Sequence, residues 1–127
     1  MPKVGPLAGC RILVIDDDFL VGQVIVDMLE DEGAEVLGPL GTVDEAITFV
    51  AEQAETIDRA VLDLNLHGLK SYPVADALAR HNIPFVFMTG YGKDALDEAY
   101  RACPHCIKPA TRQELLAALA PRNCLAV

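Results

Sequence analysis

Acidic side chains follow two apolar segments of this sequence. Asp16, Asp17 and Asp18 come directly after one apolar run, and Asp63 stands near the end of another. Carboxylates held close together repel one another unless a cation lies among them, and oxygen ligands alone favour a hard ion such as Mg²⁺. If the fold brings the two segments together, the pattern predicts a divalent metal site.

A hydroxyl and an ammonium group stand at the ends of two further apolar runs, at Thr89 and Lys108. One hydroxyl donor and one positive charge suit an anionic group placed beside a metal ion. An aspartate accepts a phosphoryl group as a nucleophile when a metal ion and a lysine neutralise the transferring oxygens. Asp63 is embedded between apolar residues, so it is the predicted nucleophile of a phosphoryl-transfer site.

The elements that position these residues are read from the hydrophobic pattern. Short apolar runs alternate five times with longer amphipathic stretches, which is typical of a βα repeat with a parallel sheet covered on both faces. Pro39 cannot donate to a sheet ladder, which puts its strand at an edge. Ligands of such sheets bind beyond the carboxyl ends of the strands. The predicted strands are 11–15, 35–40, 59–64, 84–89 and 105–108, and the predicted helices are 19–32, 42–54, 72–80, 93–101 and one that begins after the capping box at 111–114.

Four motifs resemble those of the receiver domain of two-component response regulators, over nearly the whole chain. They are the segments 12–18, 62–68, 87–92 and 107–109. The resemblance implies an α/β fold, a flavodoxin-like (βα)5 doubly wound parallel sheet with strand order 2-1-3-4-5. The expected organisation is an N-terminal extension at 1–10, a receiver domain at 11–120 and a short C-terminal tail at 121–127.

The resemblance also implies a role for each matching residue. Asp63 would be the phosphoacceptor, Mg²⁺ would be held by Asp16, Asp17, Asp63 and the backbone carbonyl of Asn65, Thr89 and Lys108 would contact the phosphoryl oxygens, and Pro109 would follow a cis peptide bond. A histidine kinase or phosphotransfer protein would donate the phosphoryl group. The signal would pass to an unknown protein or end in draining phosphate from the kinase. No enzymatic activity is expected beyond self-phosphorylation and autodephosphorylation.

Three departures from the commoner family pattern stand out. His67 replaces the usual proline, and His105 replaces the aromatic switch residue, usually Tyr or Phe. The stretch from Thr89 to Lys108 is about three residues short, which predicts an abbreviated fourth helix and an altered output face. This segment resembles stand-alone receivers. Tyr91, two positions after the threonine, is expected to shield the phosphoryl group from water.

The helix predicted at 19–32 has an apolar face and a second face that points away from the core. Its spacing predicts that Val21, Val24, Ile25, Met28 and Leu29 face the core. Phe19, Gly22, Gln23 and Val26 would then point away from it. Two explanations of this second face stay open, namely docking of the kinase and local packing over neighbouring loops.

Composition narrows the classes of function. The chain has 127 residues and a net charge of −9, which fits one acidic domain. It shows no basic patch for direct nucleic-acid binding and no apolar run long enough to span a membrane. Four cysteines without a signal peptide favour a cytoplasmic protein. The sequence Cys103-Pro104-His105-Cys106 matches a redox motif, but the apolar segment after it favours packing of a strand.

Three rival functions are weighed against the receiver. A phosphohydrolase of the haloacid dehalogenase type needs an acid/base carboxylate two residues after its nucleophile, and Asn65 stands there. In an FMN module the phosphate would face the three aspartates at 16–18 instead of amide and hydroxyl donors. A receiver-like scaffold that is never phosphorylated would not need the retained aspartates and lysine.

Overall fold

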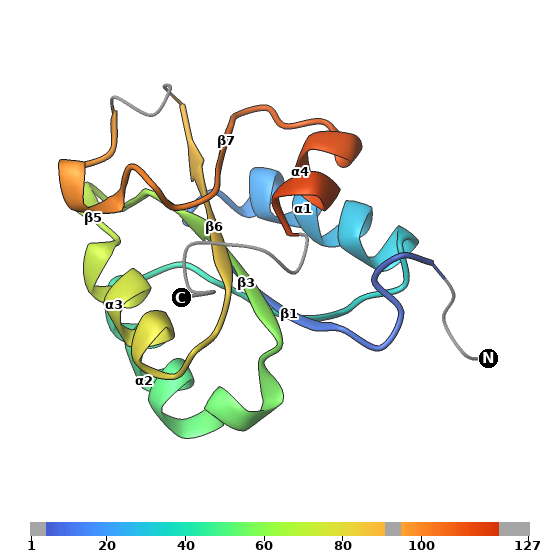
Figure 1. The fold of residues 1–127 in the computed structure, drawn as a ribbon, viewed down its shortest axis with the longest axis horizontal. Helices are drawn as coiled ribbons and strands as arrows, with labels where there is room; N and C mark the ends of the chain where they lie inside the picture. Colours follow the sequence, from blue (N-terminus) through green and yellow to red (C-terminus); the bar gives the residue numbers. More distant parts are fainter. Residues whose placement is uncertain (1–4, 91–94, 120–127) are drawn as a thin grey trace.

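The structure is a computed structural model that describes residues 5–90 and 95–119. Its centre is a parallel sheet in which the strands follow the order β2-β1-β3-β6-β7 (Figure 1). The predicted doubly wound topology is therefore confirmed, because these strands are the first to fifth segments of the βα repeat. Their bounds are β1 (Arg11–Ile15), β2 (Glu35–Leu40), β3 (Arg59–Asp63), β6 (Phe85–Thr89) and β7 (His105–Ile107).

Helices cover both faces of the sheet, α1 and α4 on one side and α2 and α3 on the other (Figure 1). Side chains of β1 alternate between the two cores: Leu13 and Ile15 pack toward α2 and α3, whereas Ile12 and Val14 pack toward α1. Burial on both faces explains why the strands are continuous apolar runs. The bounds are α1 (Phe19–Asp31), α2 (Val43–Gln53), α3 (Tyr72–Arg80) and α4 (Arg112–Ala118), with short 3₁₀ turns η1 (Ala54–Thr56) and η3 (Glu98–Tyr100).

The orientation of α1 differs from the prediction. The buried residues are Gly22, Ile25, Val26 and Leu29, whereas Val24 is 53% exposed. The assignment of Val24 to the core and of Val26 to the outer face was therefore wrong. Gly22 lies against β2, since an added Cβ would lie 3.5 Å from the Cβ of Pro39. Because of this close approach, the helix packs on the sheet through the face that carries Gly22, Ile25, Val26 and Leu29.

The helix predicted at 93–101 is not formed in the part that the structure describes. Residues 91–94 lie outside the described residues, and the segment 95–101 contains the 3₁₀ turn η3. Contacts with α3 explain the short turn: the rings of Tyr72 and Tyr100 stack with centroids 4.2 Å apart, and the amide of Asp97 donates to the Tyr72 hydroxyl at 2.7 Å. Tertiary packing thus fixes this segment over a single turn.

Residues before β1 also belong to the packed domain. Leu7 is buried in the core beneath α1, and its amide donates to the carbonyl of Glu32 at 2.9 Å. These contacts close the end of α1, where Gly33 adopts a positive φ of 98°. Among the described residues, no helix is both long and apolar enough to cross a bilayer.

Candidate functional site

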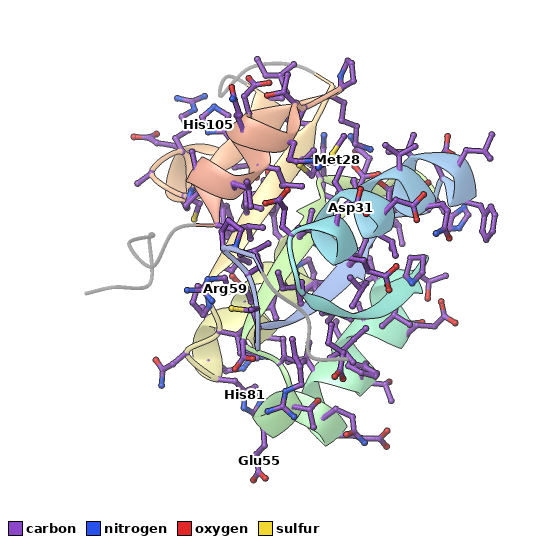
Figure 2. All side chains as sticks on the ribbon, turned by 90° about the vertical axis from the view of Figure 1, so that its right-hand side faces the viewer. Met28, Asp31, Glu55, Arg59, His81 and His105 are labelled. Atoms are coloured by element: carbon purple, nitrogen blue, oxygen red, sulfur yellow. The ribbon has the colours of Figure 1, made fainter. Side chains whose placement is uncertain are left out.

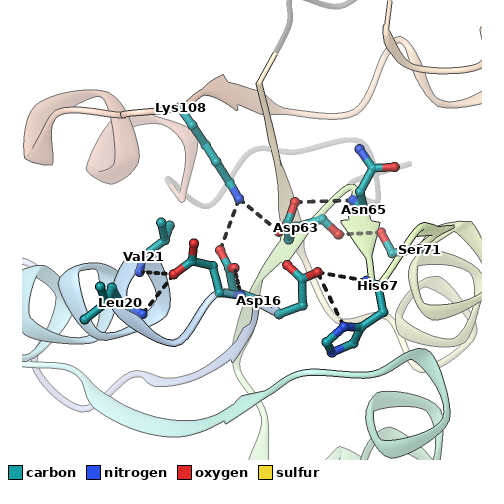
Figure 3. A network of polar contacts seen from close by, with 10 residues as sticks. Asp16, Leu20, Val21, Asp63, Asn65, His67, Ser71 and Lys108 are labelled. Atoms are coloured by element: carbon teal, nitrogen blue, oxygen red, sulfur yellow. Dashed lines mark hydrogen bonds and ion pairs between the residues drawn. The ribbon is translucent and has the colours of Figure 1, made fainter.

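Polar side chains meet at the carboxyl edge of the sheet. Asp16 follows β1, Asp63 and Thr89 end β3 and β6, and Lys108 follows β7. Asp16, Asp63 and Thr89 are buried. Because the strands are parallel, their ends share one edge, and residues far apart in the sequence become neighbours (Figure 3).

Lys108 joins two of these aspartates. Its Nζ lies 2.9 Å from Asp63 Oδ2 and 3.3 Å from Asp16 Oδ2. The Lys108 amide donates to the carbonyl of Thr89 at 2.7 Å, and the peptide bond to Pro109 is cis. The lysine backbone is therefore anchored to β6 while its ammonium group reaches across the sheet edge to β1 and β3.

Burial and charge set the ionisation of this cluster. Burial raises the pKa of Asp63 to about 6, and the negative charge of Asp16 adds to this effect, whereas Lys108 and the Asn65 amide oppose it. Burial alone would lower the pKa of Lys108, but its contacts with Asp63 and Asp16 outweigh burial and raise that pKa. The site therefore holds one cation and more acidic groups than that cation neutralises.

The surplus of carboxylates fits a divalent cation. Asp16, Asp17 and Asp63 each offer one oxygen, and these oxygens all lie within 4.8 Å of one another. Asp16 is oriented by the amide of Asp18, which donates to its Oδ1 at 2.8 Å. An all-oxygen donor set with one partly exposed member, Asp17, matches what Mg²⁺ requires, because Mg²⁺ keeps several waters when it binds.

A small hairpin beside the site was missed in the sequence. Strand β4 (Asn65–Leu66) pairs with β5 (Leu69–Lys70), and the turn residues His67 and Gly68 have positive φ values of 50° and 83°. The His67 amide donates to Asp17 Oδ2 at 2.8 Å. The sequence does carry one signal of this hairpin: the two-residue loop His67-Gly68 ends in glycine and is flanked on each side by one polar and one apolar residue.

Ser71 is a second residue that the sequence reading missed. It is fully buried, and its Oγ donates to the backbone carbonyl of Asp63 at 2.7 Å. A serine just before α3 suggests a helix N-cap, yet its side chain makes no capping bond. The hydroxyl instead fixes the strand end that carries the candidate phosphoacceptor.

Other predicted site residues lie elsewhere. His105 is partly exposed on the edge strand β7, where it pairs with Phe87 and lines a shallow groove of about 670 Å³ beside α4 (Figure 2). On α1, Phe19 is 73% exposed and Gln23 is exposed, whereas Gly22 and Val26 are buried. Tyr91 lies outside the described residues.

Cys106 of the redox-like motif is a free thiol that is buried in β7. Its Sγ lies 3.7 Å from the carbonyl of Glu114, and burial raises the pKa of the thiol. Reactive cysteines require the opposite shift. These features support a packing role for Cys106.

Comparisons with known proteins agree with this geometry. The family model described as the response regulator receiver domain matches residues 12–120. The chain is 40% identical to SdrG from Sphingomonas melonis Fr1, with a TM-score of 0.78 over 87% of this chain and 93% of that one. It is 25% identical to the response regulator PhyR from Brucella abortus, with a TM-score of 0.74 over 91% of this chain and 46% of that one.

A curated relative is longer than this chain. The transcriptional regulatory protein PdtaR from Mycobacterium tuberculosis is 26% identical over 113 residues, which cover 86% of this chain and 54% of PdtaR. The chain thus spans about half the length of that relative. The matched motifs, the strand order and the acidic cluster beside Lys108 together show that the chain belongs to the response regulator receiver domain family of two-component systems.

Proposed function

We propose that this protein accepts a phosphoryl group on Asp63 from a histidine kinase or phosphotransfer protein, with Mg²⁺ as the cofactor. The observation that carries the proposal is the contact of Asp63 Oδ2 with Lys108 Nζ at 2.9 Å inside a cluster of three carboxylates. No other arrangement among the described residues combines a buried carboxylate, a lysine and a metal-competent acidic group.

The transfer would form a bond between an Asp63 oxygen and phosphorus and break the bond between phosphorus and the donor nitrogen. Asp63 is held for this reaction, because its Oδ1 accepts the Asn65 amide at 3.2 Å and its Oδ2 accepts Lys108. Lys108 would then neutralise charge on the transferring oxygens, which is the main task in phosphoryl transfer.

Mg²⁺ would be held by Asp16, Asp17, Asp63 and the backbone carbonyl of Asn65. When bound, the ion would supply positive charge to the phosphoryl oxygens. Asp17 is suited to complete the metal site, because its side chain is 27% exposed while the Asp16 and Asp63 side chains are almost wholly buried. The buried pair thus fixes the site, and the partly exposed member leaves access for the ion.

Transmission of the signal is assigned to the edge of the sheet next to β6 and β7. We place Thr89 in contact with the phosphoryl oxygens and His105 in the position of the switch residue, and we expect Tyr91 to shield the phosphoryl group. The groove lined by His105 and α4 would be the surface to which a partner protein binds. We propose that the output is either a contact with a partner protein or the drainage of phosphate from the kinase. We also propose that the protein is cytoplasmic and has no enzymatic substrate of its own.

The kinase would dock on the first turns of α1. Phe19, Leu20 and Val24 are 73%, 74% and 53% exposed, and a largely apolar groove of about 340 Å³ between α1 and α4 continues this surface toward Pro109. Phe19 and Gln23 of the predicted docking set are accessible to a partner. Buried Gly22 and Val26 would act by fixing the helix against the sheet.

Acetyl phosphate with Mg²⁺ tests the phosphoacceptor by intact-mass spectrometry. We expect one added phosphoryl group on the parent protein and on an Asp44→Asn control, which changes an exposed aspartate on α2. Asp63→Asn should show none. An adduct that persists in Asp63→Asn would move the phosphorylation site elsewhere.

The docking surface needs a test that separates it from the chemistry. Phe19→Ala should slow transfer from the cognate kinase and leave phosphorylation by acetyl phosphate unchanged, because the small donor needs no docking surface. Ile107→Ala, which truncates a 50% exposed residue on β7, is the matched control and should slow neither reaction. Equal kinase rates for Phe19→Ala and the parent would exclude this face.

A further inference from the structure

The β4–β5 hairpin contacts two of the three clustered carboxylates through its backbone. The Asn65 amide donates to Asp63 Oδ1 at 3.2 Å, and the His67 amide donates to Asp17 Oδ2 at 2.8 Å. Figure 3 shows both hydrogen bonds at the acidic cluster. Because Asp17 follows β1 and Asp63 ends β3, one short hairpin orients carboxylates that two different strands supply.

The hairpin has few contacts of its own that would hold it in place. Each of its strands has two residues, and an isolated two-stranded hairpin is marginally stable in water. Within residues 65–70, Leu66 is buried and every other residue is exposed. The position of the hairpin backbone therefore depends on the residues that join it to the rest of the domain.

Ser71 ties the two chain ends of the hairpin together. It directly follows β5, its Oγ donates to the carbonyl of Asp63 at 2.7 Å, and its amide donates to the carbonyl of Leu64 at 2.8 Å. Asp63 and Leu64 are the two residues before β4, so this pair of hydrogen bonds closes the hairpin at its base. Ser71 is fully buried, so water does not compete for either bond.

The Ser71 hydroxyl is not used to begin α3. Serine at an N-cap usually accepts a backbone amide of the first helical turn, but this side chain makes no capping hydrogen bond. The helix uses the Ser71 carbonyl instead, which accepts the amides of Val74 and Ala75 at 2.9 and 3.1 Å. A change to alanine would therefore keep the backbone hydrogen bonds of Ser71 and remove the one bond from its hydroxyl to Asp63.

We propose that Ser71 is a positioning residue of the metal site: its hydroxyl fixes the hairpin, and the hairpin holds Asp17 and Asp63 in the geometry that binds the ion. Both carboxylates offer an oxygen to the cluster, and the backbone carbonyl proposed as a further ligand belongs to Asn65, in the hairpin itself. Loss of the hydroxyl would thus loosen the hairpin and weaken metal binding without removing any ligand. This inference rests on the metal site of the proposed function.

Calorimetric titration of the metal-free protein with Mg²⁺, without any phosphodonor, tests the inference. The variant is Ser71→Ala, and the matched control is Val50→Ala, which truncates another fully buried side chain, on α2, outside the hairpin. Partners of metal ligands typically change affinity about 10–100-fold, and Ser71 acts one contact further out, so we expect roughly three- to tenfold weaker Mg²⁺ binding in Ser71→Ala. Val50→Ala should bind Mg²⁺ like the parent, although both variants lose stability. Circular dichroism verifies that each protein is folded at the temperature of the titration.

Hydrogen exchange of the metal-free proteins reports the hairpin directly. The amides of Asn65 and His67 should exchange several-fold faster in Ser71→Ala than in the parent or in Val50→Ala, because the hairpin opens more often when its base is loosened. Equal Mg²⁺ affinity in Ser71→Ala and the parent, or unchanged exchange at these two amides, would overturn the inference and leave the metal site intact. A parent protein that binds no Mg²⁺ would overturn the proposed metal site together with the inference.

Discussion

Replacing Asp63 by asparagine should stabilise the metal-free protein at neutral and higher pH. The buried carboxylate has a pKa of about 6 against an ordinary value of 3.8, a difference of about two units. At about 1.4 kcal/mol per unit, its ionisation costs the native state at most about 3 kcal/mol. Solvent screening and local relaxation reduce this to about 1–2 kcal/mol. Asparagine has a similar shape and no charge, and Lys108 keeps Asp16 as its partner at 3.3 Å.

The effect should depend on pH in a defined direction. Because the folded-state pKa is raised, the native state holds the proton more tightly than the unfolded chain, so stability decreases as pH rises from about 4 to about 6 and the loss is complete above that. Asp63→Asn lacks this loss. Thermal melts in a chelating buffer should show a melting temperature about 3–8 °C above the parent near pH 8, with the difference vanishing near pH 4.

Two results would refute this reasoning. A metal-free Asp63→Asn protein that is less stable than the parent near pH 8 would mean that the contact with Lys108 outweighs the cost of burial. A difference that stays constant down to pH 4 would mean that ionisation of Asp63 is not its cause. Mg²⁺ serves as the internal check, because it should raise the melting temperature of the parent more than that of the variant.

Three further outcomes are expected. Asp17→Ala should weaken Mg²⁺ binding at least tenfold in a calorimetric titration and leave the metal-free melting temperature unchanged or higher, because it removes a repelling carboxylate. Ser71→Ala should lower the free energy of unfolding in urea by about 1–2 kcal/mol, because the buried carbonyl of Asp63 loses its donor. Tyr100→Phe should cost less than about 1 kcal/mol in the same assay, since the stacked ring remains and only the bond to Asp76 is lost.

The sheet and the polar residues at its carboxyl edge were both predictable from the apolar runs of the sequence. A parallel strand buried on two faces must be almost wholly apolar, so a polar or charged residue inside or directly after such a run is conspicuous. Asp63, Thr89 and Lys108 were each found in this way. Parallel pairing then requires that the ends of these strands share one edge, and the structure shows this convergence.

The features that the sequence did not reveal either carry no periodic pattern or depend on a single contact of a small residue. Strands of two residues, as in the β4–β5 hairpin, carry no periodicity, and the buried hydroxyl of Ser71 looks like any helix cap before its partner is known. The rotation of α1 follows from Gly22, which a hydrophobicity pattern counts as neutral although its missing side chain permits the closest approach to β2. For Ser71 and Gly22 the deciding group is small, and its partner lies in another element.

The stability of the domain and the chemistry of its site oppose each other at Asp63. A carboxylate that is costly to ionise in the metal-free state gains free energy from any cation placed among Asp16, Asp17 and Asp63, so the burial that weakens the fold strengthens cation binding. Lys108 moderates this cost but shares its one charge between two aspartates. If a second lysine stood in the cluster, the metal-free fold would gain stability while the attraction for a divalent ion would fall. The single lysine thus leaves a surplus of negative charge, which a divalent ion would offset.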